Sequence, residues 1–72
     1  MGAYGEVRFE SRDELEKHED EILDKLDEFG CTITYCPDDL KVELVRNGGY
    51  NIDVDEINAA MEKYGGKVVV TG

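Results

Sequence analysis

The sequence lacks the features that would place the chain in or across a membrane. No apolar run approaches the roughly 20 residues that a membrane-spanning helix needs. Residues 1–6 have neither the basic stretch nor the apolar stretch of a secretory signal. With only two cysteines in the chain, these absences predict a cytoplasmic protein.

Basic residues are also scarce. Eight lysines and arginines face 18 aspartates and glutamates, and the net charge is −10 over 72 residues. Such a chain repels phosphates, which disfavours direct binding to DNA, RNA or an anionic membrane. A basic protein surface is the favoured partner. Adaptation to high salt would also enrich acids, but lysines outnumber arginines here and the acids are clustered.

The residues needed for common catalytic sets are missing. With a single histidine, His18, no specific serine-histidine-acid or cysteine-histidine set can be assembled. His18 falls on an apolar helical stripe, where a packed histidine is the expected role. The glycine pairs match no nucleotide-binding pattern. The sequence therefore predicts a protein that is not an enzyme.

The two cysteines lie in one predicted strand. Cys31 and Cys36 are five residues, or about 16 Å, apart and point to opposite faces, so they cannot form a disulfide with each other. Reduced, structural thiols are expected, with a reactive thiol at Cys36 as the alternative.

The first half of the chain reads as strand, helix, strand. Residues 5–10 alternate between apolar and charged side chains, which predicts a half-buried strand. Ser11 and Glu14 form a capping box that begins a helix. That helix is expected to run to about Phe29 and to end at Gly30. Residues 31–36 are rich in β-formers and predict the second strand.

The second half continues as strand, helix, strand. After a turn at Pro37, residues 40–45 alternate and form a hairpin with the second strand. Residues 47–49 form a loop. Asp53 is expected to cap the second helix, Ile52 and Ile57 to form its hydrophobic staple, and Gly65 to end it. The helix has an apolar stripe of Ile57, Ala60, Met61 and Tyr64. Residues 67–71 are the last strand.

This order predicts a single α+β domain over residues 1–72. Two split βαβ units with right-handed crossovers give a ferredoxin-like βαββαβ fold, in which a four-stranded antiparallel sheet carries two helices on one face.

Several functions of this fold require residues that the chain lacks. RNA-recognition domains stack bases on aromatic residues of the central strands. Here the outward positions are expected to be Glu6, Arg8, Glu10, Lys41, Glu43 and Val45. Copper chaperones, which residues 54–68 resemble in rhythm, need a Cys-x-x-Cys pair after the first strand. Residues 53–56 lack the glycine and distal glutamate of a calcium loop. No metal or cofactor is predicted.

The first predicted helix holds most of the net charge. Between Glu10 and Glu28 there are ten acids and three bases. Its apolar stripe, which must face the sheet, is Leu15, His18, Ile22, Leu26 and Phe29. The candidate partner-binding residues form an exposed row of Asp13, Glu16, Asp20, Asp24 and Asp27, flanked by Glu14, Glu21 and Glu28. On one straight helix the row would span about 21 Å.

The charges of this row are arranged in a way that destabilises a helix. Like charges four residues apart repel, as at Glu16–Asp20 and Asp20–Asp24. Asp27 and Glu28 oppose the helix dipole. Local rules broken without a structural gain point to function, although a solvated acidic face is the plain alternative. The sharper hypothesis is a carboxylate array that occupies an arginine- and lysine-lined groove in place of phosphates.

In size, acidity, cysteine content, element order and its Asp13-to-Glu28 array, the chain resembles the small acidic anti-CRISPR proteins of phages, including those aimed at type I surveillance complexes. The resemblance covers the whole chain in overall character and carries over no individual residue, because these inhibitors share no motif. It implies a non-enzymatic DNA mimic in the host cytoplasm that blocks DNA binding by a CRISPR effector. Anti-restriction proteins and other DNA mimics fit the same character.

Two alternatives remain open from the sequence. One is an interaction module that dimerises through an edge strand or the open sheet face, where Val45 and Val69 are candidate outward apolar positions. The other is a small-ligand regulatory module of the same fold. The inhibitor hypothesis is compatible with a monomer or a weak dimer.

Overall fold

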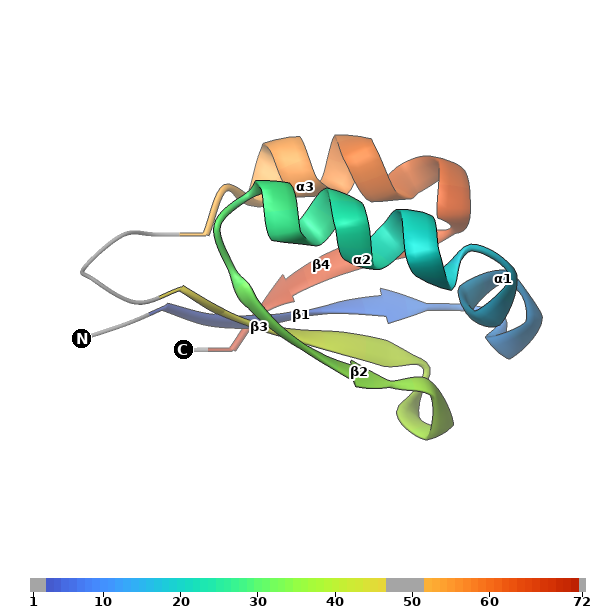
Figure 1. Ribbon diagram of the computed structural model, residues 1–72. Helices are drawn as coiled ribbons and strands as arrows, with labels where there is room; N and C mark the ends of the chain where they lie inside the picture. The colour runs from blue at the N-terminus through green and yellow to red at the C-terminus, as the bar shows by residue number, and fades with distance from the viewer. Residues whose placement is uncertain (1–2, 47–51, 72) are drawn as a thin grey trace.

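Four antiparallel strands form one open sheet in the computed structural model, which describes residues 3–46 and 52–71 (Figure 1). The strands are β1 (Ala3–Phe9), β2 (Thr32–Cys36), β3 (Lys41–Arg46) and β4 (Gly66–Val70). They lie in the order β2-β3-β1-β4, so β1 and β3 are central. The predicted α+β class, antiparallel sheet and β2–β3 hairpin are confirmed. The loop expected at residues 47–49 lies outside the described residues.

The helices are α1 (Arg12–Lys17), α2 (Glu19–Glu28) and α3 (Val54–Met61). Two 3₁₀ turns complete the structure, η1 (Pro37–Asp39) after β2 and η2 (Glu62–Tyr64) after α3. α2 and α3 lie on the same face of the sheet (Figure 1). None of the helices in the described ranges covers the other face.

The prediction of a single helix from Ser11 to Phe29 is wrong in its middle, because the structure has two helices there. Its ends are as predicted: the Ser11 hydroxyl accepts the Glu14 N–H at 3.5 Å, and Gly30 ends α2 with a φ of 77°. Between them the chain leaves helical geometry at His18, where φ is −110° and ψ is 18°. Only two residues separate β1 from α1, so the first turns form at the strand end. The chain then changes direction to run over the sheet as α2 (Figure 1).

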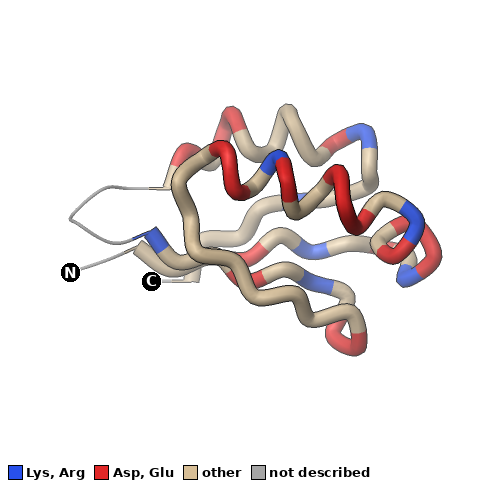
Figure 2. The backbone as a smooth tube through the Cα atoms, viewed as in Figure 1, with Lys and Arg blue, Asp and Glu red and all other residues tan. Residues whose placement is uncertain are grey.

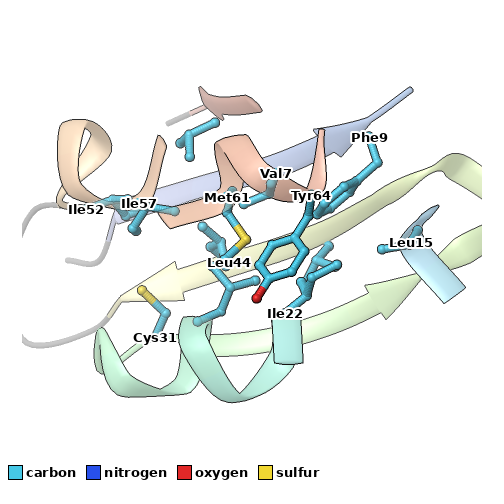
Figure 3. Packing of buried hydrophobic residues seen from close by; sticks show 13 residues of the cluster. Val7, Phe9, Leu15, Ile22, Cys31, Leu44, Ile52, Ile57, Met61 and Tyr64 are labelled. Atoms are coloured by element: carbon cyan, nitrogen blue, oxygen red, sulfur yellow. The ribbon is translucent and has the colours of Figure 1, made fainter. Parts of the chain in front are cut away.

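The core lies between the sheet and the helices. Leu15, Ile22 and Leu26 are fully buried, and His18 and Phe29 are half-buried, so the predicted stripe is confirmed. The second stripe is also confirmed, since its members Ile57, Met61 and Tyr64 are buried and Ala60 is half-buried. Figure 3 shows the helical side chains meeting Val7, Phe9 and Leu44 of the sheet. Each large apolar side chain buried there contributes about 1.5–3 kcal/mol to folding.

Asp53 stands at the start of α3 but does not cap it. Its side chain makes no capping hydrogen bond; its Oδ2 atom instead accepts from Arg46 Nη1 at 3.0 Å. Asn58 adds a second link between α3 and the sheet, because its Oδ1 atom accepts the Val68 N–H at 2.7 Å. The expected cap is thus replaced by an ion pair to β3, since a charged donor lies within reach of the carboxylate.

The uncovered face of the sheet contains a buried carboxylate. Glu6 is only 8 % exposed; Arg8 Nε donates to its Oε2 atom at 2.5 Å, and Lys41 Nζ lies 3.8 Å from Oε1. The hydrogen bond from Arg8, aided by the charges of Arg8 and Lys41, holds the pKa of Glu6 below its ordinary value. β1 also begins earlier than expected, at Ala3, and therefore adds the exposed Tyr4 to this face. The expectation that the outward positions hold no aromatic residue is corrected here.

A substitution at Gly66 tests the close packing of β4 on the core. A methyl group at this position would lie 2.8 Å from the Phe9 ring and 3.0 Å from Met61 and Val7 atoms. We expect Gly66→Ala to lower the free energy of unfolding by about 1–3 kcal/mol, measured by urea denaturation. Lys67→Ala, an exposed neighbour, is the control, with an expected change below about 0.5 kcal/mol. Equal losses in both variants would contradict this packing.

The pH dependence of stability in Glu6→Gln tests whether the buried carboxylate stabilises the fold. Since the folded-state pKa of Glu6 lies below its ordinary value of 4.5, the ionised group stabilises the fold above the unfolded-state pKa. That contribution is lost as the pH falls through the lower, folded-state pKa. The difference in unfolding free energy between wild type and Glu6→Gln should be full at pH 7 and shrink below about pH 4. Denaturation at a series of pH values measures it; a constant difference would argue against the network.

Candidate protein-binding surface

The eight predicted partner-binding acids all lie on the surface. Each of their side chains is exposed: Asp13, Glu14 and Glu16 on α1, and Asp20, Glu21, Asp24, Asp27 and Glu28 on α2. Figure 2 shows acidic positions along both helices. The burial of Leu15, Ile22 and Leu26 on the opposite side of the same turns fixes this orientation. We call these eight residues the acidic surface.

The geometry of the acidic surface differs from the expected straight row. The break at His18 leaves Asp20, Asp24 and Asp27 on α2, where they span seven residues or about 10 Å. Asp13 and Glu16 lie on α1, which points in another direction (Figure 1). The five carboxylates therefore form two short segments with a bend between them, and the uninterrupted 21 Å array is wrong.

Most of the row is not neutralised by bases. Within residues 3–46 and 52–71, no ion pair involves Asp13, Asp20, Asp24 or Asp27. Glu16 lies 3.0 Å from Arg12, which also reaches Asp38 of η1 at 3.0 Å. The flanking acids have weaker partners, such as the Lys25–Glu28 pair at 3.7 Å. The negative charge thus remains available to a partner.

His18 sits at the bend as a packed residue. Its ring lies 5.1 Å from the Tyr64 ring, centroid to centroid. Its two nitrogens lie 3.5 Å from a Glu14 oxygen and 3.6 Å from a Glu21 oxygen, contacts that become ion pairs only when the imidazole is protonated. With 27 % of its side chain exposed, His18 occupies the expected position at the edge of the core.

A groove next to the acidic surface was not predicted. It has a volume of about 320 Å³ and is lined by Glu21, Asp24, Lys25 and Glu28 of α2 and by Lys63 and Tyr64 of η2. Lys63 Nζ lies 5.0 Å from the centre of the Tyr64 ring. Sequence reasoning missed this groove because its two walls are about 40 residues apart in the chain.

Charge is divided between the layers of the structure. The four strands contain four bases and two acids, whereas the rest of the chain contains four bases and sixteen acids. The helical layer includes acids outside the predicted set, since Asp55, Glu56 and Glu62 are also exposed. The helical layer is therefore strongly negative, and the sheet is not.

The thiols offer little reactivity. Both cysteines are free, Cys31 buried and Cys36 half-buried. Burial raises the pKa of the Cys31 thiol. Burial and the Glu43 carboxylate raise the pKa of the Cys36 thiol. Because the thiolate is the nucleophile, the raised pKa of Cys36 opposes the alternative of a reactive thiol there.

Metal-ligand clusters and membrane-spanning helices are absent from the part of the chain that the structure describes. No three histidine, cysteine, aspartate or glutamate side chains there converge as metal ligands. In the same residues, no helix has the length and apolar character needed to cross a membrane.

No known protein-family model matches the sequence, and no curated protein matches it significantly.

The unpaired acids predict a stabilising effect of salt. Screening weakens repulsion among exposed charges, so the Tm of the wild type should rise by a few degrees between about 0.05 and 0.5 M sodium chloride. Asp20→Lys/Asp24→Lys/Asp27→Lys removes much of this repulsion, and its Tm should rise less. Thermal unfolding followed by circular dichroism measures both slopes. Equal slopes would mean that repulsion on α2 is unimportant.

Proposed function

We propose that the protein is a non-enzymatic inhibitor whose acidic surface binds the basic nucleic-acid-binding surface of another protein as a DNA mimic. The observation that carries this proposal is the set of exposed carboxylates without ion pairs on α1 and α2. The resemblance to small phage anti-CRISPR proteins makes a CRISPR effector, such as a type I surveillance complex, the proposed target. Binding would block the effector's access to target DNA.

The spacing of the carboxylates supports mimicry of a phosphate backbone. On α2, Asp20, Asp24 and Asp27 place one negative charge about every 5 Å along the helix axis. A strand of B-DNA places one phosphate about every 3.4 Å along its axis. The helical array is sparser than DNA, but it presents charge of the same sign at a comparable scale to arginines and lysines that line a groove.

The bend at His18 supports a concave target surface. Acids on α1 and α2 point in two directions, so one molecule can meet two walls of a basic groove. Long-range attraction between the −10 chain and a positive groove would speed association and make it strongly dependent on salt. Both properties suit an inhibitor that competes with nucleic acid.

We also infer that the fold is ferredoxin-like. The element order, the central position of β1 and β3, and the placement of α2 and α3 on one face support this assignment. The fold hosts many functions, so the proposal depends on the acidic surface and not on the fold.

The decisive test compares two triple variants with the same net charge. Asp20→Lys/Asp24→Lys/Asp27→Lys changes the acidic surface, while Asp39→Lys/Asp55→Lys/Glu62→Lys changes three other exposed acids that have no ion pair within the described ranges. A purified type I surveillance complex is mixed with each protein, and its binding to target DNA is measured by fluorescence anisotropy. We expect the first variant to inhibit about 100-fold more weakly than wild type and the second to change inhibition by less than about 10-fold.

The outcomes separate the parts of the proposal. Full inhibition by the first variant would remove α2 from the interface. Equal loss in both variants would mean that net charge, and not the acidic surface, determines binding. Absence of inhibition by the wild-type protein, with other CRISPR effectors tested in the same way, would reject the CRISPR target.

A further inference from the structure

The uncovered face of the sheet is organised into three rows that run across the strands. The register gives a row of Cys36, Lys41, Arg8 and Lys67, a middle row of Thr34, Glu43, Glu6 and Val69, and a third row of Thr32, Val45 and Tyr4. One end of the face is therefore basic and the other is apolar or hydroxylated. The face has two unlike ends on either side of the buried Glu6.

This face is where two copies of the chain would repel each other least. Three bases, Arg8, Lys41 and Lys67, outnumber its two acids, Glu6 and Glu43. The α2 part of the acidic surface lies in the helical layer on the other side of the sheet, whereas α1 lies at the end of the sheet (Figures 1 and 2). Two copies that meet through their uncovered faces keep the acids of α2 on their outer sides, separated by both sheets.

The apolar end carries an exposed aromatic side chain. Tyr4 is 52 % exposed and lies opposite Val45 of β3. Val69, opposite Glu6, is half-buried on the same face. The two outward valines expected from the sequence are thus on this face, and Tyr4 extends them into an apolar patch without a cover among the described elements.

The face is complementary to itself. On β1, Tyr4 and Arg8 lie two residues on either side of Glu6, and the Arg8 side chain is 63 % exposed although it binds Glu6. A two-fold axis that lies in the interface and crosses the strands at Glu6 would bring each Arg8 over the Tyr4 of the other copy. A guanidinium over a tyrosine ring is a favourable cation–π contact. The same axis would bring the two Val69 side chains together, and it would also place Glu43 of one copy opposite Glu43 of the other. The favourable contacts are therefore those of Arg8 with Tyr4 and of Val69 with Val69.

We propose that the uncovered face binds a second copy of this chain in a symmetric dimer. Such an interface is isologous, since the same patch serves both copies. Four strands about 4.8 Å apart and five residues long cover roughly 350 Å² per copy. The two copies together bury roughly 700 Å², below the about 1,000 Å² expected of a stable interface, so the dimer is weak and forms only at high protein concentration. It uses the face opposite α2 and does not depend on the proposed function.

Sedimentation equilibrium between about 10 μM and 1 mM tests the dimer. Tyr4→Ser should weaken dimerisation about ten-fold or more, because it removes both cation–π contacts and much of the apolar patch. Val70→Ser is the matched control: Val70 is also 52 % exposed, but it pairs with Gly5 and belongs to the other side of β4. It should leave the dimer unchanged. Val69→Thr, which keeps the β-branched shape, should weaken the dimer as well.

Salt gives a second, independent signature. Each copy carries a charge of −10, so screening should strengthen the dimer between about 0.05 and 0.5 M sodium chloride. Binding through the acidic surface to a basic target should weaken over the same range. A wild-type protein that is monomeric throughout overturns the proposal. Loss of the dimer in Val70→Ser with no effect of Tyr4→Ser also overturns it, since pairing would then use the other side of β4.

Discussion

Burial of one face of the sheet under α2 and α3 is the interaction on which the rest of the structure depends. A 72-residue chain with a charge of −10 has a small core and strong self-repulsion, so it has little stability to spare. Ile22, Leu26, Ile57 and Met61, all fully buried, supply the packing that offsets this repulsion. The same packing sets the rotation of each helix about its axis and thereby turns the acids of α2 outward. The exposed carboxylates are a consequence of which residues fill the core.

The two sides of the molecule differ because the helices and the strands carry different charges. Carboxylates that follow helical spacing end up on the outer side of the helical layer, whereas the few charges on the strands sit in alternation with the core residues. On the sheet, Glu6 is enclosed by Arg8 and Lys41 and adds little to the surface potential. A molecule arranged in this way can present one strongly negative side to a basic protein and keep a nearly balanced side for contacts of a different kind.

The sequence predicts the local features of this fold well and its long-range features less well. Ser11, Gly30 and the apolar stripes act over a few residues, so the helix ends and buried faces follow from spacing alone. The break at His18 is marked by no proline or glycine. It depends on where β1 ends relative to the path of α2 over the sheet, and this relation is set by tertiary packing and not by local sequence. The groove lined by Tyr64 and Lys63 has the same cause, since its walls come from opposite halves of the chain. The exposure of all eight predicted acids was predictable, but the bend in their row was not.

The edge strand β2 has a consequence for how the protein behaves at low pH. Its five residues, Thr32–Cys36, include no charged side chain, and β2 lies at the border of the sheet. Lysines, prolines or bulges within such a strand normally prevent it from pairing with other chains. Here the negative charge of the whole molecule takes over that task by keeping copies apart. Near the isoelectric point of about 4.3 the net charge falls to zero and this barrier disappears, so β2 is the strand through which copies of the chain would then pair.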